Sequence, residues 1–291
     1  MNAAPTSTAN PGAAAPEAGK PGGTVGGHGA QWMARMPWLG MGIDTARQVG
    51  AFTLIALATL VTQRRHATRV IGPMVQAQVD RAGVRVLPII CFLGVAIGAL
   101  IVSQTTLLLV QVGQGDLVGS LLATVVVREL APLTAALVVL ARVGTATVAE
   151  LGMARAMGEV EALEALGIDP VHYLVVPRLV GMSAAIVCLT AYLVMTALGA
   201  GYVVAFVRGL SMTPAEFAGA VAGALSWVDF PLLALKTAGF GVLTSMIICF
   251  HGLARPLRME EVGDATTRTV AHTVVACVLL DGLFVPVYLA L

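Results

Sequence analysis

Charged residues are scarce in this sequence. Only 11% of its 291 residues are Asp, Glu, Lys or Arg, whereas 57% are hydrophobic. Soluble globular domains carry about 25% charged residues, so this composition argues against that class of protein. Several apolar runs are long enough to cross a bilayer. We therefore expect an all-α integral membrane protein with no nucleic-acid partner. The formal net charge of +1 argues neither for nor against an anionic partner.

Motifs for catalysis are also absent from the sequence. It contains no G-x-x-x-x-G-K-[ST] pattern, so any dependence on ATP has to come from a separate subunit. It contains neither H-E-x-x-H nor G-x-S-x-G, and we expect no catalytic residue and no cofactor. Four cysteines lie in apolar runs without C-x-x-C spacing and are expected to be small buried hydrophobes rather than metal ligands: Cys91, Cys188, Cys249 and Cys277.

The composition changes along the chain and predicts three regions. Residues 1–30 are rich in Ala, Pro, Gly, Ser and Thr and are expected to form a disordered tail rather than a signal peptide. Residues 31–85 carry Trp and Arg anchors typical of interfacial amphipathic helices, although a short re-entrant or tilted span remains an alternative for residues 50–62. Residues 86–291 are expected to form five transmembrane helices, at about 86–112, 117–141, 172–207, 230–253 and 266–291.

The second predicted span contains an embedded pair of charges. Arg128 and Glu129 are the only ionisable residues in the 25 residues from 117 to 141. Such a run is about 37 Å of helix at ~1.5 Å per residue, which places the pair near its middle. A charge there costs roughly 2.5–3.5 kcal/mol, so each should face protein or a polar cavity and have a partner. The pair could fix helix packing, but the cost favours a functional role, such as contact with a polar substrate group.

A short amphipathic helix is predicted from residue 153 to residue 166. Apolar residues recur there at helical spacing, with acidic residues between them. Gly167 is a natural residue to end this helix, and Asp169-Pro170 is a typical start for the next one. The helix could be an ordinary interfacial loop helix or one that docks onto a partner.

Several motifs in this region resemble the MlaE (YrbE) family of permeases from lipid-transporting ABC systems. They are ARVGTATVAELG at 141–152, EALEALGIDP at 161–170, VVPR at 175–178 and ATTRTVAH at 265–272, and the resemblance covers roughly residues 45–291. It departs at Met157-Gly158-Glu159, where the family often has Thr-Glu-Gln. Because an interior glycine costs about 1 kcal/mol, the local helix is expected to be weaker.

The resemblance implies an assembly of several proteins in a bacterial inner membrane. The segment after the second span would be a coupling helix on an ABC ATPase subunit, two permease copies would form a homodimer, and an MCE-domain protein would exchange membrane lipid with them. The residues carried over to coupling are Glu150, Gly152, Arg155, Glu159, Glu161, Glu164 and Gly167.

Arginines predict the orientation of the spans. Seven precede the first span, and others flank the 153–166 helix and the loop before the last span, so the N-terminus and both loops should be cytoplasmic and the C-terminus on the far side. Lys236 is expected to snorkel from the outer end of the fourth span. In the fifth, Thr266, Thr267 and Arg268 are expected to cap the helix, and His272 and Asp281 to serve in packing or hydrogen bonding.

Two functions are compatible with these features. In the first, the chain moves phospholipid, Arg128 meets the lipid phosphate and Glu129 holds Arg128 or a neighbouring helix; nucleotide-driven closure of the ATPase pushes on the 152–166 segment and narrows a cavity at the dimer interface. In the second, it is a stand-alone secondary transporter or channel. Its ion path would use Arg128, Glu129, His272 and Asp281.

Overall fold

The computed structural model describes residues 47–54, 68–111, 118–209, 213–254 and 260–290, all within the compact unit Asp44–Leu291. In these ranges every regular element is a helix, and five helical runs are long and apolar enough to cross a membrane. This confirms the predicted all-α membrane fold. The five runs are Gly72–Leu107, Gly119–Ala156, Val171–Val207, Asp229–Ala254 and Val262–Tyr288. The predicted tail and most of the region 31–67 lie outside the described residues.

The first run begins with a short amphipathic helix. α3 (Thr68–Val79) passes through a π-helical turn, η1 (Asp80–Val84), into α4 (Leu87–Gln111). Ahead of it, the short helical segment 47–54 packs Phe52 edge-on against Phe250, with ring centroids 6.2 Å apart.

The second run is longer than predicted and alternates α- and π-helical pieces. It continues 15 residues beyond the expected end at residue 141, because residues 145–156 stay helical and bury one face, including Val148 and Leu151. The Arg128-Glu129 pair therefore lies in the first third of the run and not near its middle. The pieces are α5 (Val118–Leu122), η3 (Ala123–Leu130), α6 (Ala131–Val139), η4 (Leu140–Gly144) and α7 (Thr145–Ala156).

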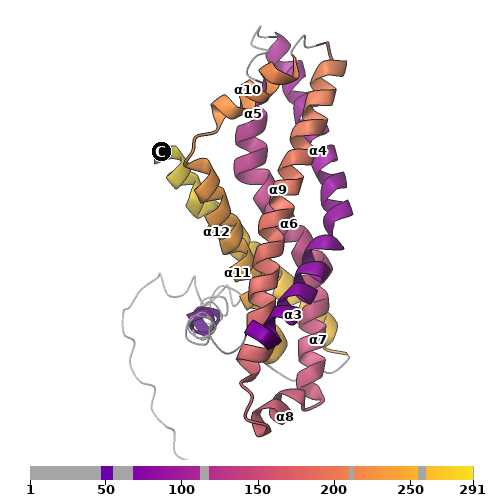
Figure 1. Cartoon of the computed structure of the whole chain (residues 1–291), viewed down its shortest axis with the longest axis vertical. Coiled ribbons are helices and arrows are strands. Elements are labelled where there is room, and N and C mark those ends of the chain that lie inside the picture. Colours follow the sequence, from indigo (N-terminus) through magenta and orange to yellow (C-terminus); the bar gives the residue numbers. More distant parts are fainter. Residues whose placement is uncertain (1–46, 55–67, 112–117, 210–212, 255–259, 291) are drawn as a thin grey trace, which may run out of the picture. The chain divides into compact units, whose positions relative to one another are not determined.

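The third run supplies the central helix of the bundle. After the turn η5 (Val171–Val175), α9 (Val176–Val207) packs against α3, α4, α6 and α11 (Figure 1). A Cβ atom at Gly94 would collide with the Thr196 side chain, and one at Gly98 with the carbonyl group of Ala197. The G-x-x-x-G pair of α4 therefore permits close approach of α4 and α9.

The segment predicted to couple to an ATPase is not one helix. α7 ends at Ala156, Gly158 takes a left-handed φ of 78°, and α8 (Glu159–Ala165) runs in a new direction to Gly167, whose φ is 73°. The prediction of a single helix from 153 to 166 is wrong because Gly158 breaks it; glycine adopts this conformation without the steric cost that a Cβ atom imposes. The predicted helix end at Gly167 is confirmed, and Asp169 accepts a hydrogen bond from the Val171 N–H at 2.9 Å, as expected of a cap.

Three helices complete the chain. α10 (Pro214–Ala224) begins with a capping box: the Thr213 hydroxyl and the Glu216 carboxylate each accept a hydrogen bond from the other residue's backbone N–H. α11 (Asp229–Ala254) and α12 (Val262–Ala290) are the last two spans. Because α12 starts at Val262, Thr266 and Thr267 do not cap it, contrary to prediction; their hydroxyls donate to carbonyl groups one turn earlier within the helix.

Candidate functional site

Lys236 of α11 is buried at the centre of a group of charges. Its side chain is 0% exposed, and three oxygen atoms lie within 2.9 Å of Nζ. The carboxylate of Glu129 in η3 accepts at 2.9 Å, the backbone carbonyl of Arg128 accepts at 2.8 Å, and the Asp281 carboxylate of α12 forms an ion pair at 2.8 Å. An ammonium group has three N–H donors, so all three have an oxygen nearby.

Pro132 explains why a backbone carbonyl belongs to this group. In an α-helix the N–H of residue 132 would bond the carbonyl of residue 128, but proline has no N–H and its ring crowds that carbonyl. The chain is π-helical from Ala123 to Leu130 just before this proline. π-Helical bulges are frequent at functional sites. Lys236 donates a hydrogen bond to the Arg128 carbonyl, to which Pro132 cannot donate.

Arg128 forms a second, adjacent ion pair. Its Nη2 donates to Asp229 Oδ2 at 2.8 Å and to the carbonyl of Ala224 at 3.3 Å. Asp229 is the first residue of α11 and also accepts from the Ser226 N–H at 2.7 Å, so Arg128 ties the loop between α10 and α11 to the second run. The guanidinium carbon lies 5.4 Å from the centre of the Tyr288 ring. Arg128 Nε is buried and has no hydrogen-bond partner among the described residues.

We name these five residues the charge cluster: Arg128, Glu129, Asp229, Lys236 and Asp281. With all groups ionised it carries two positive and three negative charges. It joins the second run, α11 and α12, and gives an otherwise apolar region of the bundle a polar centre. Such a centre can fix the positions of three spans and can offer a guanidinium group to an anion.

Sequence reasoning singled out two of the five residues, Arg128 and Glu129. Glu129 was expected to hold Arg128 or a neighbouring helix, and the structure shows the second: it contacts Lys236 of α11. The prediction that Lys236 snorkels is wrong, because its ammonium group turns into the bundle toward two carboxylates. A lone lysine in an apolar helix needs a partner, and this rule could have linked Lys236 to Asp281.

His272 does not belong to the cluster. Its Nδ1 lies 3.0 Å from Nε2 of His251, whose own Nδ1 donates to the carbonyl of Ile247. His272 precedes Asp281 by nine residues, about 13 Å along a helix. The four residues of the proposed ion path therefore do not form one continuous group.

The residues expected to couple to an ATPase divide into two sets. Glu150 lies between two arginines, bonding Arg81 at 2.8 Å and lying 3.8 Å from Arg178, while Gly152 is buried and Arg155 is half-buried. The others lie on what we call the elbow, residues 156–168, at the opposite end of the bundle from α10 (Figure 1). Glu159, Glu161, Glu164 and Gly167 are exposed there. Met157 and Leu166, also on the elbow, are 70% and 75% exposed.

Known proteins resemble this chain over most of its length. The family model described as "Permease MlaE" matches residues 75–287, which include nearly all of the five runs and the whole charge cluster. The chain belongs to this family. It is therefore a multi-pass membrane protein of a family of transport permeases, not of enzymes.

Individual relatives share less than a third of their aligned residues with this MlaE-family chain. The intermembrane phospholipid transport system permease protein MlaE of Haemophilus influenzae is 27% identical over 82% of this chain and 91% of its own. A probable ABC transporter permease protein of Synechocystis is 29% identical over 62% and 68%. The chloroplast protein trigalactosyldiacylglycerol 1 of Arabidopsis thaliana is 27% identical over 70% and 58%.

Proposed function

We propose that this protein is the permease of an ABC system that moves phospholipid between its membrane and an MCE-domain partner. The observation that carries the proposal is the family match over residues 75–287, together with a relative, named for intermembrane phospholipid transport, that aligns over 91% of its length. Since the sequence has no Walker A motif, a separate ATPase subunit supplies the energy.

The elbow is the surface on which this ATPase docks. It presents exposed apolar side chains, Met157 and Leu166, beside exposed carboxylates. Apolar side chains surrounded by charges are typical of protein interfaces. Two arginines lie on either side of the elbow in the sequence, Arg155 in the last turn of α7 and Arg178 in the first turn of α9. They support a cytoplasmic position for the elbow.

A push on the elbow reaches the charge cluster through the second run. From Ala156 back to Glu129 the chain is continuously helical, about 40 Å at ~1.5 Å per residue. α7 is in tight contact with α11, because a Cβ atom at Gly252 would lie only 2.7 Å from Cβ of Leu151. Closely packed helices move together rather than deform, so ATPase closure displaces the second run and α11 as a unit.

Within the cluster, Arg128 contacts the phosphate of the lipid. Its side chain is 22% exposed and its Nε has no partner among the described residues, so donors remain for a second anion beside Asp229. Glu129 is a positioning residue that holds α11 through Lys236. The lipid path lies at an interface with a second copy of the chain, and the apolar side chains that α12 leaves exposed fit either that copy or lipid: Val275, Val278, Leu279 and Leu283.

Two variants separate these roles in a complex assembled with the ATPase. Glu159→Lys/Glu161→Lys should lose the ATPase on purification, while Arg128→Ala should keep the ATPase but carry several-fold less bound phospholipid. Arg128→Lys keeps the charge but loses the bidentate fork, so it should carry an amount of phospholipid between those of the native chain and Arg128→Ala. If the chain were a stand-alone transporter, the Glu159→Lys/Glu161→Lys variant would transport normally, and that result would overturn the proposal.

A further inference from the structure

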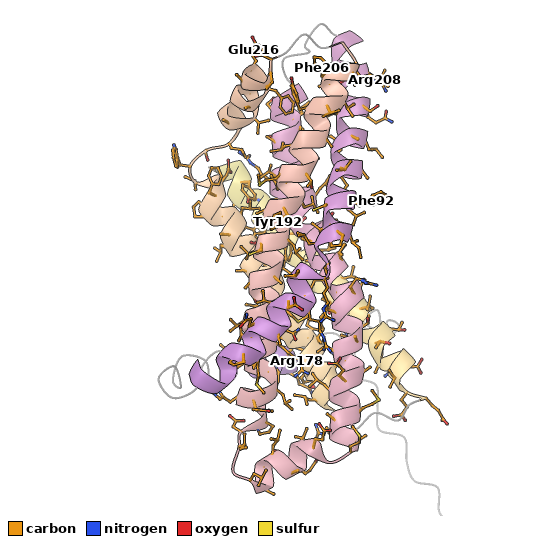
Figure 2. The ribbon with its side chains drawn as sticks, turned by 45° about the vertical axis from the view of Figure 1, so that its right-hand side comes forward. Phe92, Arg178, Tyr192, Phe206, Arg208 and Glu216 are labelled. Atoms are coloured by element: carbon orange, nitrogen blue, oxygen red, sulfur yellow. The ribbon has the colours of Figure 1, made fainter. Side chains whose placement is uncertain are left out.

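A polar cavity lies far from the charge cluster. It has a volume of about 460 Å³ and is bounded by α3, η1, η5 and the start of α9. Its polar lining consists of Gln78, Asp80, Arg81, Arg85, Tyr173 and Arg178. Figure 2 shows Arg178 where α3 crosses α9, at the opposite end of α9 from Arg208. We call it the arginine pocket.

Positive charge exceeds negative charge in the arginine pocket. Arg85 pairs with Asp80 at 3.2 Å, and Arg81 and Arg178 share the single carboxylate of Glu150. Three guanidinium groups thus face two carboxylates, which leaves one formal positive charge. Guanidinium groups hold phosphate through paired N–H donors, and five donors on each arginine exceed what the carboxylates use here.

A buried amide in the pocket also lacks an acceptor. Gln78 is 9% exposed, and its Nε2 has no hydrogen-bond partner among the described residues. The side chain is fixed against α9, because a Cβ atom at Gly181 would lie 2.7 Å from Cβ of Gln78. Leaving a buried donor unpaired is costly, so an oxygen-rich ligand in the cavity gains this hydrogen bond as well.

Apolar surface begins directly beside the arginine pocket. Val84 is exposed next to Arg85, and α4 exposes Phe92 and Val95 about two to three turns further on. Tyr173 lines the pocket itself, and tyrosine favours the boundary between head groups and hydrocarbon. A soluble anion would make no contact with this adjacent apolar face. A lipid can place its phosphate in the pocket and its acyl chains along α4.

We propose that the arginine pocket binds the head group of an anionic phospholipid carrying one net negative charge. The lipid neutralises the surplus charge, accepts from Gln78 and links α3 to α9. It is not the lipid in transit at the charge cluster, because Glu150 and Glu129 are 21 residues apart on one helical run, about 31 Å. Basic pockets of this kind recognise anionic head groups.

The test uses the full-length chain in nanodiscs that contain either phosphatidylglycerol or phosphatidylcholine. Lipid retained after a mild detergent wash is counted by native mass spectrometry. The chain should retain phosphatidylglycerol preferentially, and Arg85→Gln should weaken that retention about fivefold, the effect expected of one surface arginine. The Arg85 side chain is 72% exposed, so this variant should fold normally. Arg85→Lys should restore most of the retention.

Arg208→Gln is the matched control. It removes the same charge from an exposed arginine at the other end of α9, where Arg208 donates to Ser103 at 2.6 Å, and it should change nothing (Figure 2). Equal retention of both lipids, or equal losses in Arg85→Gln and Arg208→Gln, would overturn the proposal. So would displacement of the lipid by inorganic phosphate at millimolar concentration, since the pocket would then bind free phosphate.

Discussion

The charge cluster and the group around Glu150 have nearly the same ion-pair distances in very different surroundings. Lys236 lies 2.8 Å from Asp281 and Arg81 lies 2.8 Å from Glu150. Lys236 is 0% exposed, whereas the side chains of Arg81 and Glu150 are 47% and 38% exposed. Burial therefore decides what each pair contributes. Breaking a buried pair leaves an uncompensated charge and costs about 3–5 kcal/mol, while an exposed pair contributes about 0–1 kcal/mol.

The largest effect should come from Lys236→Met. The substitution leaves Glu129 and Asp281 as unpaired carboxylates inside the bundle, and we expect a loss of about 3–5 kcal/mol of stability. Thermal unfolding of the purified protein in detergent measures this loss. As a control, Lys236→Met/Glu129→Gln/Asp281→Asn removes all three charges and should recover a large part of it. If the single variant is as stable as the native chain, the cluster does not fix the helices.

A substitution at Pro132 tests one contact of the charge cluster, the hydrogen bond from Lys236 to the carbonyl of Arg128. Pro132→Ala returns an N–H that can bond the carbonyl of Arg128, so Lys236 loses exclusive use of this acceptor. We expect Pro132→Ala and Lys236→Met to be non-additive by about 0.5–3 kcal/mol in a double-mutant cycle followed by thermal unfolding. Pro177, in the first turn of α9, offers the matched control. Pro177→Ala should be additive with Lys236→Met, and additivity of both pairs would remove the assigned role of Pro132.

A substitution at Gly158 tests the elbow, which is separate from both the charge cluster and the group around Glu150. Its φ of 78° is the reason α7 and α8 separate, and nothing lies within 4 Å of a Cβ atom placed there. Gly158→Ala therefore costs only backbone strain, about 1–2 kcal/mol, and favours a straight helix. We expect weaker copurification of the ATPase, with a loss of thermal stability no larger than this strain. Gly219→Ala in α10, where a Cβ atom also meets nothing, is the control and should leave the ATPase bound.

The sequence predicted helices better than it predicted their partners. Apolar runs located all five spans, and the helix end at Gly167 and the helix start at Asp169 followed from local chemistry. Local rules failed where contacts from distant segments decide the outcome. Lys236 is 107 residues from Glu129 in the sequence, so no local rule paired them. The long lysine side chain suggested snorkelling, whereas the fold brings three oxygen atoms to its ammonium group. The break at Gly158 was underestimated because glycine was counted only as a weak helix former.

Arg81→Gln should have the smallest effect on stability. It removes one of the two arginines beside Glu150, but Arg178 lies 3.8 Å from the same carboxylate and can move closer, and water solvates what remains. We expect a loss within about 1 kcal/mol that shrinks further at 1 M salt, where the Debye length is about 3 Å. The loss caused by Lys236→Met should change little with salt, because screening ions do not reach a fully buried ammonium group. Thermal unfolding of both variants at low and high salt compares the regions directly. Equal salt dependence would mean that solvent reaches the charge cluster, and the argument from burial would then fail.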